Sequence, residues 1–175
     1  AVGYAALSDN TTGAQNTAVG NDALRNITTG DNNTGVGYQA LYNSETGVSN
    51  VAIGRDALYS NTSGDSNTAV GNDALENNTT GENNTAIGKN ALNDNTTADN
   101  NTAVGKDALD ANTTGERNTA IGRSSLTDCT SGDYNTGAGY ISLQSVTSGH
   151  KNTACGYVAG GAITTGDNNL MLGYQ

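Results

Sequence analysis

The sequence lacks several residue types on which ordinary globular domains rely. It has no Pro, Phe or Trp, and its 175 residues include one His, one Met and two Cys. Only 34% of the residues are hydrophobic, too few for an ordinary globular core of large side chains. By composition alone such a chain resembles a disordered one. It also has no apolar run of the length that a membrane-spanning helix needs, so we expect no membrane insertion.

Basic residues are scarce as well. Asp and Glu number 17 against seven Lys and Arg, which gives a net charge of -10. This acidity argues against nucleic acid and anionic membrane surfaces as partners. With His150 as the only His, no catalytic triad can be assembled, and no Cys/His spacing suggests zinc. We therefore expect no enzymatic activity and no cofactor, and we interpret His150 as a solvated turn residue.

What the sequence does have is a repeat of 17 residues. Asn67-Thr68-Ala69-Val70-Gly71 returns as Asn84-Thr85-Ala86-Ile87-Gly88, and the spacing never slips. The repeat glycines are Gly3, Gly20, Gly37, Gly54, Gly71, Gly88, Gly105, Gly122, Gly139, Gly156 and Gly173. A fixed period without insertions is typical of a solenoid, in which each coil stacks on the next. We predict an all-β parallel β-solenoid, a β-roll of about ten coils, formed by residues 1–175 as one segment of a longer fibrous protein.

Two columns of the repeat hold its large apolar residues, and we predict that both form the core. One is the Val/Ile column and the other the Leu column, so Val70, Ile87, Val104, Leu75, Leu92 and Leu109 should be buried. No helical spacing fits this pattern. We predict two short strands in each coil instead, Asn-Thr-Ala-Val and the weaker Asp-Ala-Leu. The position of Cys155 in the Val/Ile column predicts a core thiol, and Cys129 should be an unbridged surface thiol.

The remaining positions of the repeat predict turns and polar ladders. In Asn-Thr-Thr-Gly-Asp, the turn glycines such as Gly81 and Gly115 are expected to take a positive φ, although Ala98 interrupts their column. An Asn stands four residues before each repeat glycine from Gly20 onward. Identical Asn side chains stacked at coil spacing can bond into an amide ladder, or can bond their own backbone.

Asn67-Thr68-Ala69-Val70-Gly71 and its equivalents resemble the Asn-Ser-Val-Ala-Ile-Gly repeats in the head domains of trimeric autotransporter adhesins. The longer unit, with Ala-Leu and Asn-Thr-Thr-Gly, is similar to repeats of phage and viral tail-fibre proteins. The resemblance implies a left-handed roll, three chains to a trimer, and an extracellular place on a virion tail or cell surface. The period of 17 is longer than that of the adhesin heads, and no catalytic residue comes with the motif.

A physical argument also favours a homotrimer. A roll with one Val and one Leu per coil has little interior, so burying another face against a partner would add about 25 cal/mol per Å² of apolar surface. The small side chains of the Ala columns, such as Ala69 and Ala74, would let the chains approach closely. A monomeric solenoid is the alternative.

Two sets of side chains are candidate sites. Acidic residues follow the turn glycines, and stacked carboxylates either splay into water or hold Ca²⁺. The candidate metal ligands in this column are Asp31, Asp65, Asp99 and Asp133. Tyrosines follow several repeat glycines, where they either cover the roll or offer rings that stack on sugars. The candidate ligand surface consists of Tyr4, Tyr38, Tyr140, Tyr157 and Tyr174.

The sequence thus predicts a structural role. We expect a stiff fibre segment of a tail fibre or surface adhesin, which contacts a host-surface glycan or protein receptor. The alternative from another class is an ice- or carbohydrate-binding solenoid. It is suggested by an outward row of threonines, Thr17, Thr34, Thr68, Thr85, Thr102 and Thr119.

Overall fold

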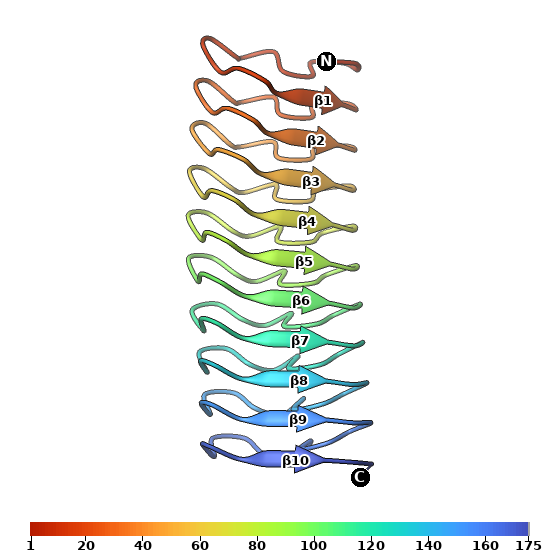
Figure 1. Ribbon diagram of the computed structural model, residues 1–175. Coiled ribbons are helices and arrows are strands. Elements are labelled where there is room, and N and C mark those ends of the chain that lie inside the picture. Colours follow the sequence, from red (N-terminus) through yellow and green to blue (C-terminus); the bar gives the residue numbers. More distant parts are fainter. Residues whose placement is uncertain (175) are drawn as a thin grey trace.

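The computed structural model describes residues 1–174 and confirms the parallel β-solenoid. Ten strands form a single sheet in which each strand lies between its predecessor and its successor in the chain (Figure 1). The strands are β1 (Thr17–Val19), β2 (Thr34–Val36), β3 (Val51–Ile53), β4 (Thr68–Val70), β5 (Thr85–Ile87), β6 (Thr102–Val104), β7 (Thr119–Ile121), β8 (Thr136–Ala138), β9 (Thr153–Cys155) and β10 (Leu170–Leu172). No helix occurs within residues 1–174.

The register between the strands follows the 17-residue period without a slip. Thr68 pairs with Thr85, Ala69 with Ala86, and Val70 with Ile87, and the same offset recurs along the whole sheet. Neighbouring strands in a sheet lie about 4.8 Å apart, so the nine steps from β1 to β10 span about 43 Å. The result is a rod with its termini at opposite ends (Figure 1).

Each coil contains one strand, so the prediction of a second strand is wrong. In the Asp-Ala-Leu segment, Asp73 has a φ of 58° and Leu75 a φ of 52°, and the same two positions are left-handed in the other coils. Left-handed backbone costs a non-glycine residue roughly 1–2 kcal/mol. Here it folds the chain into a tight corner that still bonds to the next coil, since the Leu75 N–H donates to the Ala91 carbonyl at 3.0 Å.

The core consists mainly of leucine and alanine, and Ile27, Cys129 and Val146 are also fully buried. Leu75, Leu92 and Leu109 are fully buried as predicted, and the central Ala of each Thr-Ala-Val strand also points inward. The Val/Ile column faces outward, so its predicted burial is wrong. The side chain of Ile87 is 41% exposed, and Val70 and Val104 are half-buried.

The reason lies in strand alternation and in the width of the interior. Because successive residues of a strand point to opposite faces, Ala and its neighbouring Val cannot both face the core. The leucine from the opposite wall already fills the space across from the Ala position. Even at Gly35, in that column, an added Cβ would lie 2.9 Å from Cδ1 of Leu24. The interior therefore holds one Leu and small partners.

Exceptions to the repeat keep the core volume balanced. Gly160 interrupts the Leu column, and Met171 replaces the inward Ala of its strand. A Cβ on Gly160 would lie 2.6 Å from Cε of Met171, so the larger side chain occupies the space that the leucine leaves. Similarly, Gly137 lies where Ser125 needs room, because a Cβ there would lie 2.4 Å from the Ser125 Oγ.

The two glycine columns serve different purposes. Repeat glycines such as Gly71 have a φ near 145°, and a Cβ there would lie 2.4 Å from the carbonyl oxygen of Gly88. The turn glycines have no positive φ, so that prediction is wrong. Their constraint is close packing, since a Cβ on Gly81 would lie 2.5 Å from the carbonyl oxygen of Ala98.

The invariant Asn column links successive coils through the interior. The Asn101 Oδ1 accepts the backbone N–H of Asn118 at 2.9 Å, and its Nδ2 donates to the carbonyl of Gly115 at 2.8 Å. The same pair of bonds recurs at Asn33, Asn50 and other members of the column, most of them fully buried. In most of the column this is a ladder from side chain to backbone, one of the two uses that the sequence suggested.

An amide-to-amide ladder forms in a second column, eleven residues further along each coil. The Asn78 Nδ2 donates to the Asn61 Oδ1 at 2.9 Å, and the Asn95 Nδ2 donates to the Asn78 Oδ1 at 2.7 Å. Cys129 belongs to this column, and its thiol is buried. It occupies the position at which Asn112, one coil earlier, donates to the carbonyl of Gly115. The sequence predicted Cys155 in the core and Cys129 at the surface. The structure shows the reverse, because Cys129 is buried and Cys155 is exposed.

Truncating a core leucine should cost far more than truncating a strand-face isoleucine. We expect Leu92→Ala to destabilise its coil by about 2–5 kcal/mol, because the buried side chain leaves a cavity. Ile87→Ala, the matched control, should cost much less, since its side chain is 41% exposed. Amide hydrogen exchange of the coil that carries each change measures the local cost. Equal costs would contradict the assignment of the Leu column to the core and of the Val/Ile column to the outer side of the sheet.

Candidate functional site

The surface carries two shallow hollows of notable size and no group of metal ligands. An open apolar hollow of about 450 Å³ lies at the last coil beside Met171, Ile163 and Tyr174. A polar hollow of about 370 Å³ lies beside Asp133, His150 and Asp167. Within residues 1–174 no cluster of three or more His, Cys, Asp or Glu side chains is placed to hold a metal ion.

The candidate metal ligands act as caps for the backbone. The Asp99 Oδ1 accepts the N–H of Glu82 at 2.7 Å, and the Asp133 Oδ1 accepts the N–H of Glu116 at 2.8 Å. Asp31 and Asp65 make the same bond to the preceding coil. Each carboxylate thereby satisfies a turn N–H that no strand ladder reaches, which is a structural use of the acidic column.

These aspartates recur every second coil, a period of 34 residues that includes Asp167. The positions between them hold Ala14, Val48, Glu82, Glu116 and His150. At coil spacing, two aspartates in this series are about 9.6 Å apart along the rod. Oxygen ligands of Ca²⁺ lie about 2.3–2.6 Å from the ion, so two of these aspartates cannot share one cation in this arrangement.

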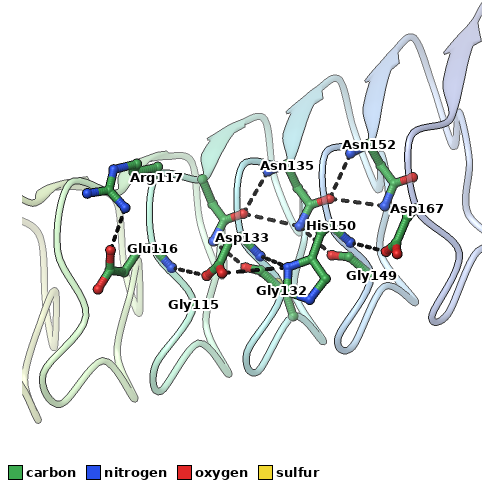
Figure 2. A network of polar contacts seen from close by, with 12 residues as sticks. Gly115, Glu116, Arg117, Gly132, Asp133, Asn135, Gly149, His150, Asn152 and Asp167 are labelled. Carbon is green, nitrogen blue, oxygen red and sulfur yellow. Dashed lines mark hydrogen bonds and ion pairs between the residues drawn. The ribbon is translucent and has the colours of Figure 1, made fainter.

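His150 continues the same column and joins the network of caps. Figure 2 shows its ring beside Asp133, with Asp167 following in the next coil. The Asp133 N–H donates to the His150 Nδ1 at 3.0 Å, and the His150 N–H donates to the Asp167 Oδ1 at 2.7 Å. The Nδ1 thus accepts in place of a carboxylate oxygen, and it lies 3.6 Å from the Asp133 Oδ2. His150 is a partly exposed turn residue that caps the backbone, with no nucleophile bonded to it.

A second cluster of carboxylates surrounds Asp110. The pKa of Asp110 is raised to about 6, mainly by burial and also by the nearby charges of Asp107 and Asp94, while the Lys106 charge acts in the lowering direction. The Lys106 Nζ lies 3.0 Å from the Asp107 Oδ2. This cluster lies on the corner opposite the sheet, where the neighbouring carboxylates repel one another.

The candidate tyrosines do not form an open platform for sugars. Tyr140, Tyr157 and Tyr174 stack on one another, with ring centroids 5.3 Å and 5.2 Å apart. The Arg123 guanidinium covers the outer face of this stack, 5.8 Å from the centroid of Tyr140. Both faces of Tyr157 are therefore occupied. Tyr4 and Tyr38 are two coils apart and outside this stack, so the structure brings together three of the five.

The outer side of the sheet presents a surface that we call the strand face. It consists of the first and third residues of each strand, a Thr column and the Val/Ile column, and carries no charged side chain. Its Thr column contains Thr17, Thr34, Thr68, Thr85, Thr102, Thr119, Thr136 and Thr153. The expected outward row of threonines is thus present. It shares its face with the Val/Ile column, for which the sequence predicted a place in the core.

The strand-face threonines differ from the first Thr of each turn pair and resemble the second, since residues such as Thr80 and Thr114 also donate to no acceptor within residues 1–174. Turn residues such as Thr79 and Thr113 donate their hydroxyls to carbonyls of the next coil, at 2.9 Å and 3.0 Å. Within residues 1–174, no strand-face Thr hydroxyl has a hydrogen-bond partner in the protein. Eight hydroxyls therefore point into solvent without a role in the fold. The sequence signal for this face is strand alternation. Once the central Ala of Thr-Ala-Val is placed inward, the Thr and the Val on either side of it must point outward.

Removing the Asp99 cap should reveal whether the column is structural or metal-binding. We expect Asp99→Ala to destabilise the rod by about 1 kcal/mol, because the Glu82 N–H loses its acceptor. Asp99→Asn, which keeps an acceptor oxygen, should cost less. Thermal unfolding with and without EDTA gives both answers. A large fall in melting temperature on chelation would show that the aspartates hold structural cations.

Comparison with known proteins adds no relative. The chain matches no known protein family, no characterised protein and no solved structure. The described residues also contain no helix with the length and apolarity to cross a membrane.

Proposed function

We propose that this chain is a structural fibre segment that acts as a rigid spacer in a tail fibre or surface adhesin, outside the cell or on a virion. One observation carries the proposal, the unbroken register of ten strands at a constant offset of 17 residues. Two internal Asn columns bond successive coils in addition to the sheet. The sheet and the first Asn column continue through the coils from β1 to β10, and the second column adds amide bonds between coils from Asn61 to Asn112, so bonds between neighbouring coils oppose bending of the rod.

A mechanical role also fits the chemistry of the side chains. The carboxylates of the turn column and His150 are engaged by backbone N–H groups, and the buried Cys129 thiol has its pKa raised to about 11 by burial. Such a thiol is mostly protonated and unreactive at neutral pH. The aspartates of the turn column, His150 and Cys129 thus support the fold, which fits a structural protein.

The homotrimer stays a prediction, but its physical argument needs correction. The Ala columns that were expected to bring chains together are buried inside each coil, so Ala69 and Ala74 are unavailable to a partner. Any lateral contact must use an outer surface of the coils. Contact with a host-surface glycan or protein likewise remains a proposal, without the open tyrosine platform that the sequence suggested.

Distances between spin labels along one column test the rigid spacer directly. Labels at Asp9→Cys and Ala162→Cys lie nine coils apart on exposed positions of the same column, in a chain that also carries Cys129→Val and Cys155→Val. Pulsed electron resonance should give a narrow distribution near 43 Å, from nine steps of about 4.8 Å. The pair Asp9→Cys and Asp94→Cys, five coils apart, is the control and should give about 24 Å. A broad distribution reaching short distances would contradict a spacer function.

A further inference from the structure

The strand face is an extended, uncharged surface of the rod whose hydroxyl groups the fold does not use. Its Thr hydroxyls have no partner in the described chain, and neither does the exposed second Thr or Ser of the turns, whereas the first turn Thr, such as Thr79, donates to a backbone carbonyl. The most regular part runs over β4–β7, where Thr68, Thr85, Thr102 and Thr119 alternate with Val or Ile two residues on. High strand propensity explains why β-branched residues occur here. This row differs from the unbonded turn hydroxyls because it belongs to the sheet, where a second column of Val and Ile runs beside it.

The geometry of this face is that of a small lattice of two parallel columns on the outer side of the sheet. Neighbouring members of a column are separated by about 4.8 Å, and the two columns are about 7 Å apart, because two residues of a strand rise that far. The side chains are β-branched and therefore stiff about χ1, so the hydroxyls and methyls hold their positions before any ligand arrives. A hydroxyl both donates and accepts a hydrogen bond. The matching ligand is a neutral, rigid surface with a repeat of similar size that also donates and accepts.

We propose that the strand face binds ice. Water oxygens on the faces of hexagonal ice repeat at spacings close to those of the two columns, and each water donates and accepts. The Val and Ile methyls between the hydroxyls order water without competing for its hydrogen bonds. The neutrality of the face matches a neutral solid, although the chain as a whole has a net charge of -10.

The area of the face argues against a second copy of the chain as its occupant. Two columns about 7 Å apart over about 43 Å cover roughly 300 Å², whereas a standard interface buries about 800 Å² on each partner. Eight of the twenty residues in the two columns are also threonines, and burying an unbonded hydroxyl against another protein costs free energy. An ice surface offers a partner for each hydroxyl and no limit of area.

A sugar polymer fits less well. Flat binding of sugars uses the face of an aromatic ring, and the strand face contains no aromatic side chain. The nearby rings of Tyr140, Tyr157 and Tyr174 cover one another. The proposal concerns the surface of the isolated rod and does not depend on its being part of a fibre.

Thermal hysteresis of the purified chain, together with the shape of ice crystals grown in its presence, tests the proposal. The wild type should show hysteresis and faceted crystals. Thr102→Tyr places a bulky ring in the middle of the face and should abolish both effects. Thr97→Tyr, the same substitution at an exposed turn position, is the matched control and should behave as the wild type. Circular dichroism and melting curves check that both variants keep the fold.

Several results would overturn the proposal. Absence of hysteresis and crystal shaping in the wild type would do so, as would full activity in Thr102→Tyr or equal loss in a folded Thr97→Tyr. Light scattering that finds an oligomer, which Thr102→Tyr dissociates, would assign the face to self-association. Retention on cellulose or chitin without hysteresis would assign it to a polysaccharide. The label distances of the rod are measured separately, so a failure here leaves the spacer proposal standing.

Discussion

The fold depends on one buried interaction, the bond between each invariant Asn and the backbone of the neighbouring coil. A coil of 17 residues has an interior only one leucine wide, and polar backbone groups line much of it. The Asn101 side chain accepts from the buried Asn118 N–H, which has no route to water, and also donates to the Gly115 carbonyl, an acceptor that it shares with Asn112. Since an unpaired buried polar group costs about 1–3 kcal/mol, the column is as important to the rod as its leucines.

The same narrow interior accounts for the other columns. Small residues line the inner side of the strand because Leu fills the opposite side, and glycine is required where successive coils touch, as at Gly71 against Gly88. Larger apolar residues are therefore displaced to the outer side of the sheet. The uncharged strand face is thus a consequence of a core that has room for Ala and not for Val.

The sequence was sufficient to predict the architecture but not to predict which side of each strand faces the core. The period of 17 predicted parallel stacking, and the burial of Leu75 and Leu92 followed from their persistence. The orientation of Val70 could not be settled by hydrophobicity, because either side of a Thr-Ala-Val strand can face inward until the width of the interior is known. The corner at Asp73 and Leu75 was missed for a related reason, since a leucine gives no sign of left-handed backbone. For the candidate site, the column of Asp31 and Asp99 was recognised, but its alternation with Glu82 and its bonds to the backbone were not.

The measurement closest to the central claim is amide hydrogen exchange at the Asn118 N–H, in the wild type and in Asn101→Ala. The buried bond to the Asn101 Oδ1 predicts protection like that of the neighbouring strand amides in the wild type. Asn101→Ala should remove that protection and loosen the adjoining coil, whereas Asn77→Ala, at a partly exposed position, should leave it unchanged. Rapid exchange at Asn118 in the wild type, or unchanged protection in Asn101→Ala, would contradict the role of the Asn column.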